Sequence, residues 1–420
     1  MSLTSISYFP SQIFKRPTLR PKLSHLDFKS PRSRKMSSMV PEIRLAVLHQ
    51  AIELPLINGI RKPMKPGGYQ DSSADIAYTL SKSLSEQPSI EIHTPILSPS
   101  PTNQTHWSFP DTTSGIFSAL RNGTTTHLWA NTILFSAHPL QNLPALDAYQ
   151  DSLRIIAQPP KLVETGDDKA KVNDFLRSYS TNSSKECGKF TLPQGWTIDT
   201  SPELDIYTTL KELYLPYPVV GKPIRGRGSF GVKVCHDTDS LAAHFSLLFK
   251  DSSSVMIEEY LSGEEATVTV MPPSPSHATH WALPIVTRFG HEQGVAPYNG
   301  IVAVTANSRV VTQEECEAGV TYGEVMKECE GVAKLLGATA PIRVDVRRFG
   351  KAKENGERFA LFDVNMKPNM TGPGRPGRDD QASLTAIAAK GLGWDYKRLL
   401  REMIESAPTL RALREVELLL

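Results

Sequence analysis

The sequence predicts a mixed α/β protein that is built from more than one domain. With 420 residues, the chain is long enough for two to four domains that each bury a core of their own. Hydrophobic residues make up 40% of the chain and charged residues 21%, which is typical of a globular protein. Short apolar, strand-like runs alternate with stretches of helical pattern, and this alternation indicates an α/β architecture.

The formal net charge of +2 is unevenly distributed. Residues 1–40 hold eight Lys and Arg residues but a single acid, Asp27, so this leader carries +7 and the rest of the chain −5. A mildly acidic body argues against a nucleic-acid binder, which would need a basic face. The leader resembles an organelle transit peptide in composition, but a disordered tail or an upstream extension would look the same. We expect a cytoplasmic protein, with mitochondrial targeting as the alternative.

Cysteine usage and hydropathy exclude two further classes. The cysteines at 187, 235, 316 and 329 form no CxxC pair, so we expect reduced thiols rather than a disulfide framework. No run of about 18 uncharged apolar residues occurs, so we expect no membrane span.

The first half of the ordered chain is predicted to form an α/β domain that ends near Pro160. Its expected elements follow one another as strand, turn, helix, long surface loop and strand, at 44–48, 67–73, 74–84, 88–115 and 127–135. The second half continues with a helix, three strands, a helix that Gly337 ends, two strands and a helical tail. These lie at 167–177, 217–222, 254–261, 266–271, 314–336, 342–346, 359–364 and 379 onward.

The two strands at 342–346 and 359–364 carry the most informative polar pattern. Side chains two residues apart on a strand share a face, so Asp363 points the same way as Asn365, and Arg343 the same way as Asp345. An antiparallel pairing that sets Asp345 opposite Asp363 also sets Arg343 opposite Asn365. Opposed carboxylates repel unless a positive group separates them, and these oxygen ligands suit a hard cation such as Mg²⁺.

This metal hypothesis depends on how the two strands are connected. A two-residue turn at Asn355-Gly356 would put the two carboxylates on opposite faces. The hypothesis therefore requires an odd-length loop or a β-bulge. An exposed hairpin with scattered charges is the alternative that these residues alone leave open.

A glycine-rich loop at 221–231 is a candidate phosphate-binding element. Its glycines allow backbone N–H groups to approach phosphate oxygens, and Lys222, Arg225 and Arg227 supply positive charge. Residues 226–231 spell GxGxxG, but residues 232–235 look like a strand, whereas a dinucleotide site needs a helix there. A flap between two strands fits this pattern, and an ordinary surface loop remains the alternative.

Four motifs follow one another along the chain: GKP with its glycine-rich loop, IEEYLSGEEATV, RVDV and FDVNMKPN. Together and in this order they resemble the ATP-grasp superfamily and its D-alanine–D-alanine ligase branch. The resemblance covers about residues 161–400 and is faint over 41–160. It implies an ATP-grasp fold, in which an N-terminal α/β domain precedes two α+β subdomains that sandwich ATP. The implied divisions are 1–40 for the leader, 41–160, 161–263 and 264–420.

The resemblance also implies roles for individual residues. Nucleotide binding falls to Lys169, Lys222, Gly228, Glu258, Tyr260, Leu261 and Glu265. Magnesium (or manganese) binding falls to Asp345, Asp363 and Asn365, and catalysis to Arg343, Arg225 and Ser229. The family more often has Glu at the position of Asp363, and a shorter carboxylate favours monodentate binding.

The expected activity is ATP-dependent joining of a carboxylic acid or amino acid to an amine through an acylphosphate, with release of ADP and phosphate. An ATP-grasp kinase acting on a hydroxyl and a non-catalytic nucleotide-binding module are the alternatives. The expected partners are small-molecule substrates, without nucleic acid or membrane, and the resemblance suggests a homodimer. Mobile lids are expected at 226–231 and 289–300.

The substrate is the least defined part of the prediction. Asp71 or Asp75 could bind a substrate amino group, but either could instead cap the helix that follows. Arg375 and Arg378 lie in an insertion relative to the ligase branch. They could bind a substrate carboxylate, or they could pair with Asp379 or Asp380. These departures favour a substrate other than D-alanine.

Overall fold

The computed structural model describes residues 42–57, 61–62, 64–182, 187–226, 229–297, 303–350 and 356–419. The basic leader, Arg227, Gly228, Asn355 and part of the expected lid at 289–300 lie outside this range, so the structure does not test the predictions made for them. All four cysteines are free thiols, as predicted. Among the described residues, no helix combines the length and apolar character that a membrane crossing requires.

The first sheet is parallel, with the strand order β2-β1-β4-β5 and β3 added beside the end of β1. Its strands are β1 (Ile43–His49), β2 (Ile90–His93), β3 (Phe109–Pro110), β4 (His127–Asn131) and β5 (Arg154–Ile156). Helix α1 (Gln70–Ser81) packs with β1 and β2, and α2 (Thr113–Leu120) with β1 and β3. Leu45 and Val47 of β1 share a core with α1, whereas Ala46 and Leu48 share one with α2. Helices therefore cover both faces of this sheet.

The prediction of one long surface loop over 88–115 was wrong. This stretch forms β2, β3 and the start of α2, and Ile90, Trp107 and Phe109 are buried. The Pro, Ser and Thr content that suggested a loop is concentrated in the connections, while these few apolar residues anchor the segment to the sheet.

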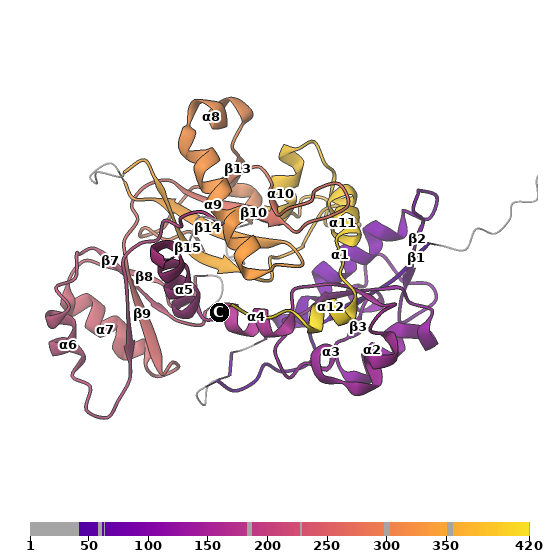
Figure 1. The fold of residues 1–420 in the computed structure, drawn as a ribbon, viewed down its shortest axis with the longest axis horizontal. Helices are drawn as coiled ribbons and strands as arrows, with labels where there is room; N and C mark the ends of the chain where they lie inside the picture. Colours follow the sequence, from indigo (N-terminus) through magenta and orange to yellow (C-terminus); the bar gives the residue numbers. More distant parts are fainter. Residues whose placement is uncertain are drawn as a thin grey trace, which may run out of the picture. The chain divides into compact units, whose positions relative to one another are not determined.

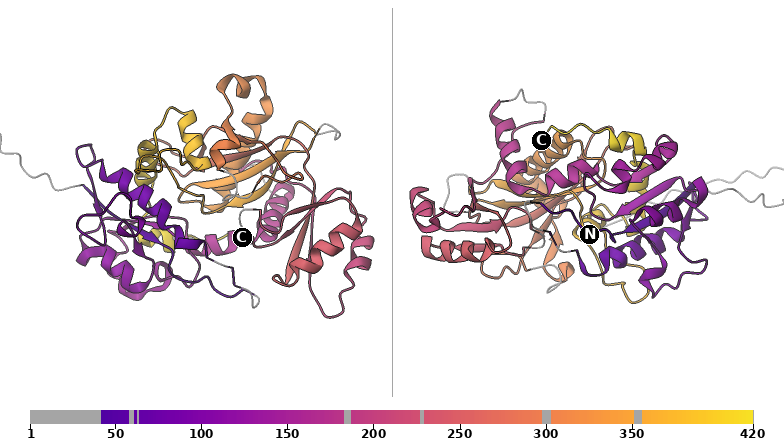
Figure 2. Two further views of the ribbon diagram at one scale, coloured as in Figure 1. Left: turned by 180° about the vertical axis from the view of Figure 1, so that it is seen from behind. Right: turned by 90° about the horizontal axis from the view of Figure 1, so that it is seen from below.

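The second sheet is antiparallel and has the order β6-β9-β7-β8. Its strands are β6 (Gly195–Asp199), β7 (Val219–Pro223), β8 (Lys233–Cys235) and β9 (Ser254–Glu259). Helices α6 (Ile206–Glu212) and α7 (Thr238–Leu248) lie side by side against it (Figure 1, Figure 2). A strand does follow the glycine-rich loop, as predicted, so the loop joins two paired strands. Helices α4 (Pro160–Gly166) and α5 (Lys169–Asn182) precede this sheet, and α5 begins two residues after the predicted start of the helix at 167–177.

The third sheet is antiparallel and has the order β13-β12-β10-β14-β15, with β11 beside β10. Its strands are β10 (Glu265–Met271), β11 (Trp281–Ala282), β12 (Val286–Arg288), β13 (Ser308–Val310), β14 (Ile342–Arg348) and β15 (Phe359–Asn365). The helix expected over 314–336 is two helices, α8 (Gln313–Ala318) and α9 (Val320–Leu336), separated at Gly319. Gly337 ends α9 with a φ of +64°, the left-handed conformation that favours glycine at a helix end.

The last two C-terminal helices return to the part of the chain that forms the first sheet. Helix α10 (Leu384–Gly391) packs on β10, β12 and β13, whereas α11 (Tyr396–Glu405) packs on α1 and α12 (Leu410–Arg414) on β5. The Leu410 amide donates to the Leu153 carbonyl over 2.8 Å. The remaining helical segments are short: α3 (Pro139–Asn142), η1 (Pro66–Tyr69), η2 (Gln104–His106), η3 (Arg121–Gly123), η4 (Pro144–Tyr149) and η5 (Val304–Ala306).

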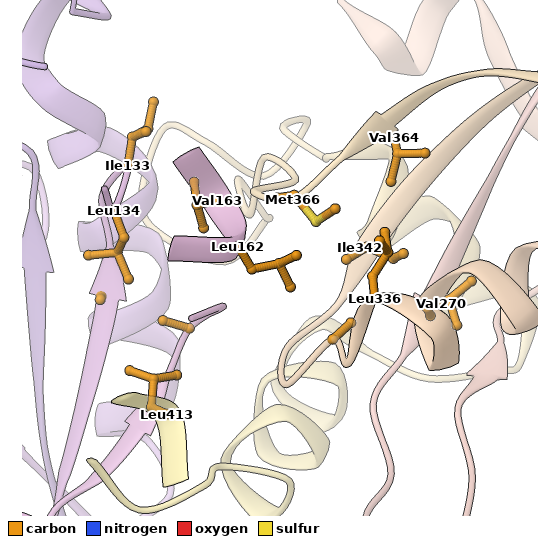
Figure 3. Close-up of a cluster of buried hydrophobic side chains, with 14 of the residues drawn as sticks. Ile133, Leu134, Leu162, Val163, Val270, Leu336, Ile342, Val364, Met366 and Leu413 are labelled. Atoms are coloured by element: carbon orange, nitrogen blue, oxygen red, sulfur yellow. The ribbon is translucent and has the colours of Figure 1, made fainter. Parts of the chain in front are cut away.

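One hydrophobic cluster joins α4 to the first and third sheets. Figure 3 shows Leu162 and Val163 of α4 lying between Ile133 and Leu134 on one side and Met366 on the other. All of these side chains are buried. The carboxyl end of β15, where Met366 directly follows Asn365, is therefore fixed against the N-terminal part of the chain.

Candidate active site

The register of β14 and β15 brings four predicted site residues to one face of the third sheet. Asp345 pairs with Asp363, and Arg343 pairs with Asn365, the register that the sequence suggested. Beyond Asp345 the register shifts, so that Val346 pairs with Leu361 and Phe362 forms a β-bulge. The bulge lets Leu361 enter the core while Asp363 faces the site, and this is the irregularity that the metal hypothesis required.

Asp345 is held by contacts from three strands. Arg343 donates to its two carboxylate oxygens through Nε and Nη2, over 2.9 and 3.0 Å. Thr267 of β10 donates to Oδ1 over 2.7 Å, and the Asn365 side-chain amide donates to Oδ2 over 3.0 Å. Burial opposes ionisation of Asp345, but Arg343 and Thr267 outweigh it and lower the pKa of this carboxyl.

Asp363 binds a different cation. Lys169, the first residue of α5, donates to Asp363 Oδ1 over 2.5 Å, and its amide donates to the Ile224 carbonyl over 3.3 Å. Burial disfavours the charged ammonium, yet Asp363 outweighs this effect and raises the pKa of Lys169. Each of these two carboxylates is thus paired with its own cation, Asp345 with Arg343 and Asp363 with Lys169.

A buried ion pair lies in the second sheet. Lys222 of β7 donates to Glu258 Oε2 over 2.5 Å, and Asn173 of α5 donates to Glu258 Oε1 over 2.9 Å. Lys222 and Glu258 expose only 4% and 3% of their surface. Lys222 also donates to the Phe362 carbonyl over 3.3 Å, so it connects β7 to the bulge in β15.

The connection between β9 and β10 carries the remaining candidate nucleotide residues. Tyr260 and buried Leu261 follow β9, and Glu265 begins β10. Glu265 accepts from His291 Nε2 over 2.8 Å and lies 3.7 Å from Arg347, whose guanidinium also lies over the Tyr260 ring at 5.2 Å. His291 was not foreseen, because no local pattern links a loop histidine to a strand 26 residues away.

The glycine-rich loop brings positive charge to the start of α5. Arg225 lies 3.3 Å from Asp168 and 4.0 Å from Asp167. Lys62 also binds Asp167, over 2.8 Å. Ser229 is exposed and has a φ of +62°, and its carbonyl accepts from the Val232 amide over 3.1 Å. No sequence motif marks Lys62, so its contact with Asp167 could not be predicted.

The four candidate substrate residues form one ion-pair cluster. Asp75 of α1 is fully buried and accepts from Arg375 Nε over 2.8 Å and from Arg378 through Nε and Nη2, both over 2.9 Å. Asp71 pairs with Lys65 at 3.2 Å and lies 3.9 Å from Arg378. Burial raises the pKa of Asp71, but Lys65 outweighs this effect and the net pKa is lowered.

Two predictions about this cluster need correction. Arg375 and Arg378 pair with Asp75, some 300 residues earlier, rather than with their neighbours Asp379 and Asp380, which are exposed. Asp71 and Asp75 also do not cap α1, whose N-cap residue Tyr69 makes no side-chain cap bond. Local spacing suggested both ideas, and the tertiary fold determines the actual partners.

The side chains around Asp345 and Asp363 offer oxygen donors to a divalent cation. No group of three or more His, Cys, Asp and Glu side chains in the described parts of the chain is arranged to hold a metal. The candidate site instead offers two carboxylates and the Asn365 amide. The hydrogen bonds described above involve neither Asp363 Oδ2 nor the Asn365 side-chain oxygen. Oxygen donors of this kind fit Mg²⁺, which keeps few protein ligands and takes phosphate oxygens for the rest.

Known proteins resemble this chain in both sequence and fold. The family model described as D-ala D-ala ligase C-terminus matches residues 202–405. The D-alanine–D-alanine ligase of Bacillus anthracis is 28% identical over 197 residues, which are 47% of this chain and 56% of that protein. The ligase of Buchnera aphidicola is 26% identical over 207 residues, 47% of this chain and 57% of that protein. The chain thus spans little more than half the length of these curated relatives.

Solved structures extend the similarity of fold over most of the chain. The D-alanine–D-alanine ligase of Bacillus anthracis complexed with ATP superposes with a TM-score of 0.55 at 18% identity, covering 89% of this chain and 99% of that one. The Coxiella burnetii enzyme gives 0.54 at 10% identity, covering 90% and 96%. Residues 202–405 therefore resemble the C-terminal part of D-alanine–D-alanine ligases, and the chain has the ATP-grasp fold of the solved enzymes.

Proposed function

We propose that this protein is an ATP-dependent carboxylate–amine ligase. The observation that carries the proposal is the β14–β15 register, which sets Asp345 against Asp363 and Arg343 against Asn365 on one polar face. Lys169 and Lys222 reach the same strand from α5 and β7, through Asp363 and the Phe362 carbonyl. Two acids, an amide, an arginine and two lysines are the groups that phosphoryl transfer followed by acyl transfer would use.

ATP would bind between the second and third sheets. We assign Lys169 and Lys222 to its phosphates, the β9–β10 connection with Glu258, Tyr260 and Leu261 to adenine, and Glu265 to ribose. Gly228 of the glycine-rich loop is assigned to the phosphates as well. This placement corresponds to a division into segments 41–160, 161–263 and 264–420, each of which carries one of the three sheets.

Asp345, Asp363 and Asn365 would hold Mg²⁺, or Mn²⁺, through side-chain oxygens. The bound cation would neutralise charge on the ATP phosphates. When phosphates enter, Lys169 can exchange its bond with Asp363 for a bond with a phosphate oxygen, because both partners are anionic. Arg343 would keep Asp345 ionised and oriented, because it binds both oxygens of that carboxylate.

The reaction would proceed in two balanced steps. A substrate carboxylate oxygen attacks the γ-phosphorus of ATP, the bond to the β-phosphate oxygen breaks, and ADP leaves. An amine then attacks the acylphosphate carbon, the bond to the phosphate oxygen breaks, and phosphate leaves as the amine loses a proton. Arg343 would stabilise the oxyanion of the second step, and Arg225 and Ser229 would help the glycine-rich loop to cover the reacting phosphate and exclude water.

The test is ADP release by the purified full chain with Mg²⁺ and ATP. Pools of D- and L-amino acids and small carboxylic acids are offered with and without hydroxylamine, and products are identified by mass. Acid-dependent ADP release with a hydroxamate or amide product is expected. A stable phosphorylated product would favour a kinase instead, and failure to bind ATP would contradict the proposal. Light scattering of the same sample tests the proposed homodimer.

A further inference from the structure

The ion-pair cluster around Asp75 lies beside the topological switch point of the first sheet. Strand β1 has β2 on one side and β4 on the other, and α1 and α2 share cores with opposite faces of β1. In open α/β sheets, ligands bind outside the carboxyl ends of the strands at such a point. Here these ends are His49 and Asn131, and Asn131 donates to the Ser72 and Ser73 hydroxyls of α1, each over 2.9 Å.

The third sheet reaches the same place. Lys367, two residues beyond Asn365, donates to the Asn131 side-chain oxygen over 3.0 Å and lies 3.6 Å from the centre of the Tyr69 ring. Lys65 lies 5.1 Å from that ring centre. Lys367 thus connects the switch point to the strand that carries the candidate metal ligands Asp363 and Asn365.

The charges at this place are not those of an ammonium-binding site. Asp75 is fully buried beneath two guanidinium groups, and Asp71 is paired with Lys65. The formal net charge of this cluster is +1, because it contains three basic and two acidic side chains: Lys65, Arg375, Arg378, Asp71 and Asp75. A substrate ammonium would have to displace a guanidinium or Lys65 to reach either acid, and it would also meet their repulsion.

Arg378 differs from Arg375 in what it presents to a ligand. Arg375 exposes 4% of its side chain and donates also to the carbonyls of Pro101 and Asp71, so it is part of the packing. Arg378 exposes 23% and uses Nε and Nη2 for Asp75. Burial lowers its pKa, but Asp75 outweighs this and raises it, so Arg378 stays charged.

We infer that Arg378 binds a second anionic group of the acyl substrate, so that the acyl substrate is a dicarboxylic acid or an acidic amino acid rather than alanine. The inference rests on the proposed ligase function. The reacting carboxylate must lie beside Asp345, Asp363 and Arg343 on β14 and β15, whereas Arg378 is fixed to α1 through Asp75. A substrate that binds at both places therefore carries two anionic groups, one for each place.

The experiment compares acids that differ only in the second carboxylate. The full chain is assayed with ATP, Mg²⁺ and hydroxylamine on propionate against succinate and on alanine against aspartate, in both enantiomers. We expect kcat/KM for at least one dicarboxylate to exceed kcat/KM for the matching monocarboxylate by about tenfold. The monocarboxylate lacks the group that would form a hydrogen-bonded charge pair with Arg378. Arg378→Gln should reduce this ratio about tenfold.

The control is Lys250→Gln, because Lys250 is an exposed lysine just after α7, and it should leave the ratio unchanged. Equal or better use of the monocarboxylates by the wild type would overturn the inference, as would an Arg378→Gln variant that keeps the ratio. So would a preference for aspartate over alanine that appears only when these amino acids serve as the attacking amine.

A separate measurement distinguishes this inference from the proposed function. If no acid yields ADP or hydroxamate, the ligase proposal fails, and calorimetry with succinate then tests the anion site alone. Weaker succinate binding by Arg378→Gln than by the wild type would support the site. Equal binding, or no binding by the wild type, would overturn it.

Discussion

Asp345 and Asp363 are direct partners across the β14–β15 ladder, and each carboxylate binds a different cation, Arg343 and Lys169. Two carboxylates placed opposite each other on paired strands are destabilising unless positive charge compensates them. The chain therefore maintains this repulsive pair with two cations, an arrangement suited to a site that exchanges its cations for a metal ion and a nucleotide.

The first prediction concerns Asp345→Asn. Loss of this carboxylate should lower kcat for ADP release at least about a thousandfold, because the proposed metal ligand and the partner of Arg343 are lost together. Asp251→Asn, at an exposed position after α7, is the matched control and should retain activity. Activity of Asp345→Asn close to the wild-type level would show that this acid holds no essential metal.

The second prediction concerns the buried pair of Lys222 and Glu258. Lys222→Met or Glu258→Leu alone should lower the free energy of unfolding by about 3 kcal/mol or more, because each leaves one buried charge without its partner. The double variant should lose clearly less than the sum of the two single losses. Urea denaturation of all four proteins measures this coupling, and strictly additive losses would contradict it.

The third prediction concerns Gly68, which precedes α1. Its φ is +55°, and a Cβ atom there would lie 1.9 Å from the Gln50 carbonyl oxygen. Gly68→Ala should therefore lower the free energy of unfolding by more than about 2 kcal/mol, since both backbone strain and a backbone clash must be relieved. Gly377→Ala is the control: Gly377 has a φ of +77° but no atom within 4 Å of a Cβ, so it should cost only about 1 kcal/mol.

The fourth prediction concerns pH. Burial, with a smaller effect from Arg154, lowers the pKa of His127 to about 4. The unfolded chain, with a histidine pKa of about 6.5, then binds more protons than the native state between these values. The stability that neutral His127 supports is complete above about pH 6.5 and falls as the pH is lowered to about 4, with about 2 kcal/mol lost by pH 5.

His127→Gln should remove this dependence. The difference in unfolding free energy between wild type and variant should change by about 2 kcal/mol between pH 7 and pH 5, measured by urea denaturation at both pH values. Burial also lowers the pKa of His49, His93, His244 and His280, so the variant should retain some loss of stability in acid. A pH-independent difference between the two proteins would contradict the prediction.

The sequence predicted the strand pair and its register because the periodicity of strands fixes which side chains share a face. It also indicated that this register needs either an odd-length loop or a bulge, and the structure has the bulge, at Phe362. The partners of Asp75 could not be predicted, because Arg375 and Arg378 lie 300 and 303 residues away and nearer acids offered plausible pairs. Lys62 and His291 were missed for the same reason, since only the tertiary fold brings them to Asp167 and Glu265.

The return of α11 and α12 to the first sheet has a consequence for synthesis of the chain. Strands β1 to β5 leave the ribosome first, but the Leu153 carbonyl and the surface of α1 receive their partners only when residues 396–414 have been made. Part of the first sheet therefore stays uncovered while about 250 further residues are synthesised. At typical elongation rates this takes on the order of tens of seconds. Chaperone binding during translation is the expected protection for so late a closure.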